Sequence, residues 1–226
     1  EKIIFDALRV KGKNYPLIYK HYDQYVKKNF LKEKNLNIGF INHKNFLPID
    51  DVQFNLIKEF KLTLKKQGYK IIDLNFDNLL KDKHDLHQKI YSRGLAYYFK
   101  EEFQNNRKDL SKIFVKMIDD GNKIKLKDYR ELIFDQQLFI NKINIMFRNV
   151  DFIVSSSTFG EAPLINKEEK KDISLIWTLA HLPSVNLPFI KKNRLPRGLQ
   201  IIAKKYDDYK LFEFLDILRN KSIIKD

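Results

Sequence analysis

The stretch from Asp151 to Leu215 constrains the fold most, because prolines and short apolar runs alternate along it. Four of the six prolines of the chain fall within it: Pro163, Pro183, Pro188 and Pro196. Residues 152–154 are apolar and follow an aspartate, which predicts a buried strand. Prolines bracket residues 182–188, and because proline cannot donate to an interior ladder, they mark the limits of a second strand. A turn at residues 196–198 and a third strand at residues 199–203 complete the pattern.

A helix is predicted to follow the third strand. Asp207 and Asp208 stand before it, where acidic side chains suit the positive end of the helix dipole and can cap free N–H groups. The apolar residues after them are spaced for one helical face: Leu211, Phe212, Leu215 and Leu218. The aspartate pair is therefore interpreted as a helix start rather than as a metal or acid–base site.

The order of these elements resembles the C-terminal part of the amidase-signature family of amide hydrolases. The residues that carry the resemblance, in family order, are Asp151, Thr158, Ala162-Pro163, Trp177-Thr178, Leu182-Pro183, Leu187-Pro188, Leu195-Pro196, Gly198-Leu199-Gln200 and Asp207-Asp208. His181 and Arg194 stand where the family mostly has glycine, and Ser155-Ser156 stands where Thr-Pro is common. These departures concern the shape of the pocket more than the fold. The short spacing from Ala162-Pro163 to Trp177 looks more like general amidases than like the A subunit of the tRNA-dependent amidotransferase.

The first half of the chain has the pattern of a βαβ unit. Residues 36–41 and 69–76 are predicted strands, and the helix between them begins at Asp50-Asp51 and stops at Gly68. Two strands that are joined in this way are expected to be parallel. Two helices are predicted before the unit, one over residues 1–10 and one that starts at Pro16.

Three more helices are predicted before Asp151. They cover residues 82–103, a segment from Leu110 to Met117 that ends at Asp119-Asp120-Gly121, and residues 126–147. The expected fold class is therefore α/β, a mixed β-sheet covered by helices, as in the C-terminal part of an amidase-signature fold. No repeat or linker interrupts residues 1–226, so we expect one portion of a domain without an internal boundary.

Composition excludes several classes of protein. Hydrophobic residues make up 43% of the chain and aromatic residues 13%, which excludes a disordered polypeptide. The absence of cysteine excludes disulfides, thiol catalysis and Cys-ligated zinc, and it fits a reducing cytoplasm. No apolar run reaches the roughly 20 residues of a membrane span. Because residue 1 is Glu rather than Met, we expect this chain to begin inside a longer one or to have been processed.

The chain is strongly basic, with a net charge of +14 from 43 Lys plus Arg and 29 Asp plus Glu. One interpretation is a surface for nucleic acid or membranes. The lysines are scattered along the whole chain and accompany abundant Ile and Asn, which favours the codon bias of an AT-rich genome. Nucleic-acid binding is therefore kept as the less favoured alternative.

The chemistry that the resemblance implies needs residues that this chain lacks. Amidase-signature enzymes use a serine nucleophile, a bridging serine and a lysine, and backbone N–H groups of a glycine-rich loop hold the oxyanion. The chain has seven glycines and no two are adjacent, so it offers no such loop. We expect no catalytic residue here, no cofactor and no metal.

The resemblance therefore implies a C-terminal segment that completes the sheet and the pocket of an amide hydrolase, with a small amide as substrate once the missing part is supplied. The alternative is a catalytically inactive binding or scaffold module of the same descent. Without the missing part, an apolar sheet edge is expected to be exposed, and because such edges pair, we predict self-association.

Four residues are candidates for substrate binding. In the family, the strand that ends at Ser155-Ser156-Ser157 faces the substrate cavity, so the resemblance points to Thr158 and Phe159. Trp177 is the third candidate, although a single Trp on an apolar helix is more often part of the core. For His181, the fourth, a pocket wall and a satisfied histidine at a strand edge both stay open.

Two other clusters are given structural interpretations. The hydroxyls of Ser155-Ser156-Ser157 are expected to bond to the backbone at a strand end, because no base or glycine elbow accompanies them. His84 and His87 are three residues apart on a predicted helix, and the polar, Lys-rich surroundings favour a solvated helix start over a metal site.

Overall fold

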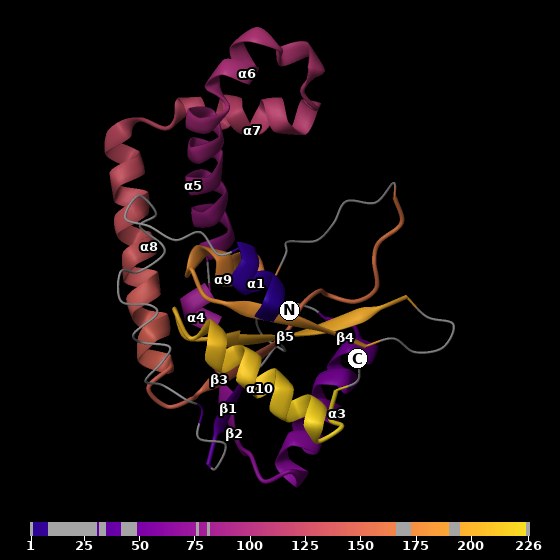
Figure 1. The fold of residues 1–226 in the computed structure, drawn as a ribbon. Coiled ribbons are helices and arrows are strands. Elements are labelled where there is room, and N and C mark those ends of the chain that lie inside the picture. Colours follow the sequence, from indigo (N-terminus) through magenta and orange to yellow (C-terminus); the bar gives the residue numbers. More distant parts are fainter. Residues whose placement is uncertain are drawn as a thin grey trace.

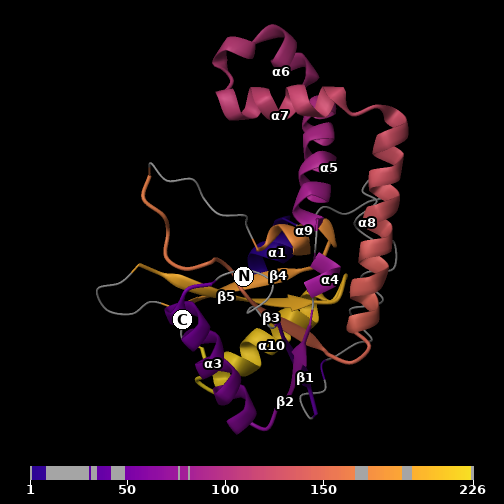
Figure 2. The ribbon, with the colours of Figure 1, turned by 180° about the vertical axis from the view of Figure 1, so that it is seen from behind.

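The computed structural model describes residues 2–8, 31, 35–41, 49–75, 77–80, 82–165, 173–189 and 195–224. Within them, a five-stranded sheet in the order β2-β1-β3-β5-β4 has helices packed on both faces (Figures 1 and 2). The strands are β1 (Asn37–Ile41), β2 (Lys70–Leu74), β3 (Phe152–Ser156), β4 (Ser184–Phe189) and β5 (Arg197–Ala203). The helices are α1 (Lys2–Leu8), α3 (Asp51–Lys66), α4 (Asp77–Leu80), α5 (Lys83–Tyr98), α6 (Lys100–Asn105), η1 (Arg107–Asp109), α7 (Lys112–Lys123), α8 (Leu126–Met146), α9 (Leu175–Leu179) and α10 (Asp208–Asn220). The predicted α/β class with a mixed, helix-covered sheet is confirmed.

The sheet is mixed because its two halves differ in strand direction. β1 pairs in parallel with both β2 and β3, and Ile38 lies opposite Ile71 on one side and Phe152 on the other. β5 runs antiparallel between β3 and β4. The carboxyl ends of β1, β2 and β3 therefore lie along one edge of the sheet, next to the start of β5.

The β1–α3–β2 unit follows its predicted pattern. Asp50 caps α3, since its carboxylate accepts a hydrogen bond of 2.8 Å from the backbone N–H of Gln53. Gly68 follows the helix with a φ of 88°, a left-handed conformation that glycine adopts without strain. The two strands of the unit are parallel neighbours, as expected.

Alternate residues of the central strands face two separate hydrophobic cores. Phe152 belongs to the core beneath α3 and α10, where its ring stacks on Phe214 with centroids 4.4 Å apart. Ile153, the next residue, belongs to the core beneath α8 and α9, which also holds Trp177. Because both faces are covered, the start of β3 is a continuous apolar run.

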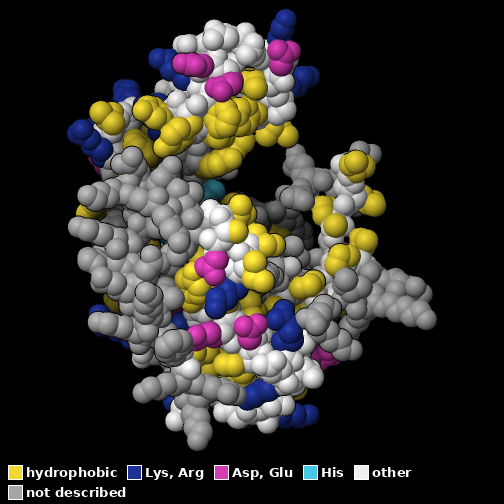
Figure 3. Space-filling model, viewed as in Figure 1, with side chains coloured by type: hydrophobic (Ala, Val, Ile, Leu, Met, Phe, Trp, Pro, Cys, Tyr) yellow, Lys and Arg dark blue, Asp and Glu magenta, His cyan; other side chains and the backbone are white. Residues whose placement is uncertain are grey.

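α5, α6, η1 and α7 project from the sheet as a helical arm of residues 83–123, which we call the arm (Figure 1). A small core of its own joins α5 to α7 through Leu95, Ala96 and Ile118. Figure 3 shows apolar side chains gathered on the side of the arm that faces the sheet. The exposed apolar residues of the arm include Tyr98 and Ile113, which are 78% and 75% exposed.

Two boundaries in the arm differ from prediction. The helix expected over residues 82–103 is interrupted at Phe99, which separates α5 from α6. The helix expected to end at Asp119-Asp120-Gly121 continues to Lys123. Gly121 is present for another reason: a β-carbon there would lie 2.0 Å from the carbonyl oxygen of Ser92, so glycine lets α7 approach the backbone of α5.

The predicted turn at residues 196–198 is wrong, because β5 already begins at Arg197, which pairs with Phe189 of β4. The strand predicted at residues 182–188 begins at Ser184. Asp207 precedes α10 as expected, but its side chain makes no capping hydrogen bond and pairs instead with Lys210 Nζ at 3.2 Å.

Two remaining predictions concern the start of the chain and the membrane. The helix predicted over residues 1–10 is α1, whereas the helix predicted from Pro16 falls outside the described residues. None of the described helices has both the length and the apolar character needed to cross a bilayer.

Candidate functional site

The candidate site lies at the carboxyl ends of β1 and β3, the edge at which open α/β sheets bind ligands. β3 ends at Ser156, and residues 157–161 follow as what we call the strand-end loop. The start of α3 lies beside this loop, since the backbone N–H of Asp50 donates to the carbonyl of Phe159 at 3.0 Å. Thr158 and Phe159 therefore lie between the end of a central strand and the start of a helix.

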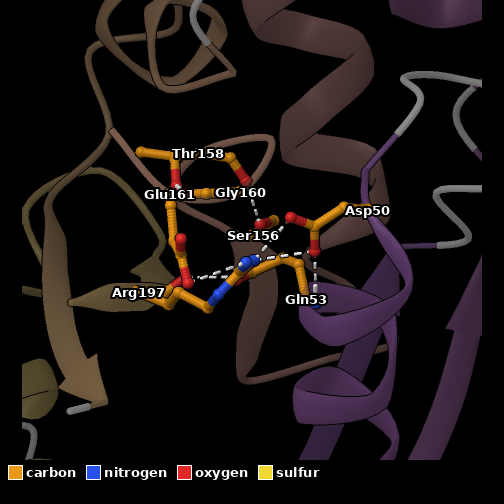
Figure 4. A network of polar contacts seen from close by, with 8 residues as sticks. Asp50, Gln53, Ser156, Thr158, Gly160, Glu161 and Arg197 are labelled. Atoms are coloured by element: carbon orange, nitrogen blue, oxygen red, sulfur yellow. Dashed lines mark hydrogen bonds and ion pairs between the residues drawn. The ribbon is translucent and has the colours of Figure 1, made fainter. Parts of the chain in front are cut away.

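Arg197, the first residue of β5, ties the loop to the helix (Figure 4). Its Nη1 donates to both carboxylate oxygens of Asp50, at 2.7 and 2.8 Å. Its Nη2 lies 3.3 Å from Glu161 Oε1 in the strand-end loop. The guanidinium thus joins three elements: a strand, a helix start and a loop.

The two side chains of this ion pair differ in exposure to solvent. The Arg197 side chain is only 10% exposed, whereas that of Asp50 is 45% exposed. Partial burial by itself would raise the pKa of the Asp50 carboxyl, but hydrogen bonds from Arg197 and from the backbone of Gln53 and Val52 hold the pKa below its ordinary value of 3.8. Asp50 is therefore a carboxylate at neutral pH, and Arg197 has a permanent counter-charge.

Two glycines let these parts approach closely. Gln53, which is fully buried, donates from Nε2 to the carbonyl of Gly198 at 2.7 Å. The backbone N–H of Ser157 donates to the same carbonyl at 3.1 Å. A β-carbon on Gly160 would lie 2.3 Å from Asp50 Oδ2, so a larger residue there would push the Asp50 carboxylate away from the loop.

Three hydroxyl groups at the end of β3 and in the loop bond to nearby backbone, whereas the hydroxyl of Ser157 donates to Asn186 Oδ1 at 2.6 Å. Ser155 Oγ donates to the carbonyl of Ser156, and Ser156 Oγ donates to the carbonyl of Thr158. Thr158 Oγ1 donates to the carbonyl of Gly160 at 2.8 Å. The prediction that the serine hydroxyls bond the backbone is confirmed for Ser155 and Ser156, and the lone pairs of the Thr158 hydroxyl stay able to accept.

Trp177 and His181 lie at the other end of the sheet. The start of β4 is opposite the end of β5 and hence beside the start of β3, since Ser184 pairs with Ile202 and Ile202 with Ile153. Thr158 follows the far end of β3. The structure thus brings Thr158 and Phe159 together but separates them from Trp177 and His181.

Trp177 is buried, whereas His181 is exposed. Trp177 is 1% exposed within the core beneath α8 and α9. His181 has a φ of 55°, and its Nε2 lies 3.3 Å from Gln136 Nε2, which also donates to the carbonyl of Leu179. Burial, and then the charge of Lys205, lower the pKa of His181, which favours a neutral imidazole that accepts from Gln136.

Sequence reasoning missed the residues that organise this site. Asp50 was expected only as a helix cap, and Arg197 only as part of a turn, while Gln53 and Glu161 carried no signal. Alternation along the third strand would have pointed Arg197 to the same face as Leu199 and Ile201, which is unusual for a charged residue. Among the described residues, no group of three or more His, Asp or Glu is placed to hold a metal ion.

Comparisons with known proteins agree on one family. The chain matches the model of the Amidase family over residues 6–212. It is 22% identical, over 210 residues, to the A subunit of the glutamyl-tRNA(Gln) amidotransferase of Methanobrevibacter smithii, a match that covers 85% of this chain and 46% of that protein.

Solved structures give the same fold. A crystal structure of an amidase superposes with a TM-score of 0.71 at 16% identity, over 81% of this chain and 45% of that one. The allophanate hydrolase of Kluyveromyces lactis superposes with a TM-score of 0.64 at 19% identity, over 80% of this chain and 31% of that one. This chain therefore spans about half the length of such relatives or less. Because the family match extends over most of its residues, the chain belongs to the amidase family.

Proposed function

We propose that this chain is the C-terminal segment of an amidase-signature hydrolase that cleaves a carbon–nitrogen bond of a small amide. In this proposal residues 1–226 act as one portion, complete the sheet and supply one wall of the substrate pocket. The match to the Amidase family over residues 6–212 carries the proposal. The position of Thr158 and Phe159 at the carboxyl edge of the sheet supports it.

The catalytic serines and lysine would come from residues outside this chain. Amide hydrolysis by a serine needs backbone N–H groups that approach the carbonyl oxygen closely, which adjacent glycines allow. No two of the seven glycines here are neighbours. A serine on the other segment would attack the amide carbon, and the C–N bond would break to release ammonia and leave an acyl-enzyme ester. Water would then cleave that ester, which releases the acid and restores the serine hydroxyl.

The role of this chain would be to hold the strand-end loop against the substrate. Arg197, paired with Asp50 and Glu161, fixes the loop on the start of α3. The Thr158 hydroxyl donates to Gly160 and keeps its lone pairs for an N–H group of a ligand. Phe159 would cover the amide and keep water from it. The cysteine-free sequence supports a reducing compartment, and we propose the cytoplasm.

The test is a comparison of turnover with and without a complementing segment. The chain is assayed for ammonia release from propionamide, benzamide and glutamine, alone and coexpressed with the amino-terminal half of the amidase whose fold it shares. We expect turnover only in the combination, and none when the serine nucleophile of the added half is replaced by alanine. Turnover by this chain alone would refute the proposal. A complex without turnover would support the inactive binding module instead.

A further inference from the structure

The two outer strands of the described sheet, β2 and β4, are protected against further pairing to different degrees. An outer strand presents unpaired N–H and C=O groups, and proteins usually shield such an edge with charged side chains or proline. On β2, the side chain of Asp73 is 69% exposed and its carboxylate pairs with Lys61. The outer edge of β2 therefore carries charges that an arriving strand would have to strip of water.

β4 has no such charges, since residues 184–189 include no Asp, Glu, Lys or Arg. One contact shows which of its backbone groups bond to β5: the N–H of Ala203 donates to the carbonyl of Pro183 at 3.0 Å, directly before β4 begins. Because bonding alternates along an antiparallel pair, the N–H and C=O groups of Ser184 and Asn186 point away from β5. Within the described part of the chain, no other strand pairs with β4 on that side.

Pro188 belongs to the same outward-facing set of β4. Its nitrogen has no hydrogen to donate, and proline is tolerated at such a position because it removes no bond from the ladder to β5. It shortens the open edge without closing it, because the N–H groups of Ser184 and Asn186 and the carbonyl groups beside them stay available. β4 is therefore the edge that can accept a further strand.

The space beyond β4 is hollow and bordered by apolar side chains. β4 is the outer strand nearer to the arm in both views, and the molecule is hollowed between the arm and the sheet (Figures 1 to 3). The arm exposes Tyr98 and Ile113, and the segment that leads on from the strand-end loop, which projects beside the hollow, exposes Leu164 and Ile165 by 72% and 99%. Single exposed apolar residues are ordinary, but apolar surface gathered around an open strand edge is typical of a protein interface.

The relatives indicate what fills this space. This chain covers 45% of the amidase and 46% of the amidotransferase subunit, so each of those proteins has more than an equal length of further chain. A second copy of this chain would bring its own net charge of +14 to the contact, and that charge opposes association. The segment that carries the catalytic serines is therefore the better occupant.

We infer that the sheet continues at β4. A β-strand of the segment that carries the catalytic serines pairs with Ser184 and Asn186, and the rest of that segment packs between the arm and the residues that follow the strand-end loop. Backbone hydrogen bonds supply the affinity of such strand addition, and the alternate side chains supply its specificity. The inference rests on the proposed function, which leaves the place of contact open, and deepens it by assigning that contact to one edge of the sheet.

Hydrogen exchange locates the contact and needs no turnover. The backbone amides of this chain are followed by NMR in the free chain and in the complex with the coexpressed amino-terminal half of the amidase. In the free chain, we expect the amides of Ser184 and Asn186 to exchange faster than those of Val185 and Leu187. In the complex, the first two should slow by at least about tenfold. Slowing at Asp73 of β2 instead would overturn the inference.

Two substitutions at one position separate strand addition from folding. Asn186→Pro removes an N–H that points outward and places a ring along the open edge, while the ladder to β5 keeps its bonds. Asn186→Ala removes the same side chain, together with its hydrogen bond from Ser157, but keeps the N–H. We expect Asn186→Pro to weaken association with the amidase half by at least about tenfold relative to Asn186→Ala, at similar urea midpoints.

The matched control is Asp73→Pro on the other outer strand. The N–H of Lys70 donates to Leu36 beside β1, so by alternation the N–H of Asp73 points outward, and its loss should leave association unchanged. Equal weakening by both Asn186 variants, weakening by Asp73→Pro alone, or no association at all would overturn the inference.

Two further outcomes separate this inference from the alternatives. If the amides of Ser184 and Asn186 become protected in the free chain as its concentration rises, a second copy occupies the edge and the inference is wrong. Because the readouts are exchange and association, the inference can hold in a complex without turnover, which would refute only the proposed hydrolase. It can also fail at β4 while the complex turns over an amide.

Discussion

Arg197 is the residue on which the strand-end loop depends most, since its buried guanidinium lies between Asp50 and Glu161. Arg197→Met should lower the free energy of unfolding by about 1–3 kcal/mol, less than for a fully buried pair because the carboxylate of Asp50 can regain water. The control is Arg219→Met, which removes an exposed pair with Asp216 and should cost under ~0.5 kcal/mol. Urea denaturation measures both, and equal losses would contradict a special role for Arg197.

Asp50 makes the stability sensitive to acid. Its pKa in the folded chain is lowered from 3.8, so the carboxylate stabilises the fold at every pH above about 4. As the pH falls through the lowered pKa, the unfolded chain binds the proton first and this stabilisation is lost. Between pH 5 and pH 3 the urea midpoint should therefore fall more for the natural protein than for Asp50→Asn. Parallel curves would show that the pair with Arg197 does not set the pKa.

For single residues, the sequence predicts roles that depend on neighbours along the chain, but it does not predict contacts with residues far away in the sequence. The capping role of Asp50 follows from its place before an amphipathic helix, and the structure has it. Its pairing with Arg197 joins residues 147 positions apart, and a Pro-Arg-Gly triplet has the composition of a turn. His181 illustrates the same limit: its φ of 55° is a left-handed backbone conformation, a constraint that no side-chain argument reveals.

At the scale of the elements, two glycine substitutions in α5 and α7 should change the stability of the fold in opposite directions. Gly121→Ala would place a β-carbon 2.0 Å from Ser92 O and should destabilise the fold by about 1–3 kcal/mol. Gly94→Ala lies within α5, where a β-carbon meets nothing within 4 Å, and should stabilise it by roughly 0.5–1 kcal/mol. Thermal denaturation tests both. Stabilisation by both substitutions would mean that helix propensity outweighs the close contact at Gly121, and destabilisation by Gly94→Ala would contradict the open space around that position.

Helices and strands were predictable wherever their pattern was local. Hydrophobic periodicity and the positions of glycine and proline predicted the β1–α3–β2 unit, α8 and the strands around Pro188. The structure contains all of them. Two errors came from signals that tertiary contacts override: Asp-Asp-Gly reads as a helix stop, yet Gly121 serves an interhelical contact, and the continuous pattern over residues 82–103 hides the interruption at Phe99. Such contacts join residues that the sequence does not place together.

For the whole molecule we predict self-association of this chain on its own. In the part of the chain that is described, β2 and β4 are the outer strands of the sheet, and the arm exposes Tyr98 and Ile113. The net charge of +14 opposes contact between copies, so added salt should strengthen association by screening it. Sedimentation velocity over a range of concentrations tests this. A compact monomer throughout, with and without salt, would count against it.

The double variant Tyr98→Glu/Ile113→Glu tests whether copies of the chain associate through the arm or through the outer strands of the sheet. If the arm joins the copies, this variant should be monomeric under conditions in which the natural protein associates. If the outer strands do, it should associate as before, because neither substitution lies in the sheet.

The pairing of β1 with β3 also limits the order in which the strands can pair during synthesis. Ile38 cannot meet Phe152 until the ribosome has added the residues between them, and β5, which completes the hydrogen bonding of β3, is made later still. Bringing the ends of so long a segment together costs conformational entropy before the strand pairing can stabilise the chain. Long-range contacts of this kind slow folding in general. The edge of β1 that pairs with β3 must therefore stay open until β3 has been made, even though β2 can cover the other edge earlier. Chaperones have their longest opportunity to bind at that open edge.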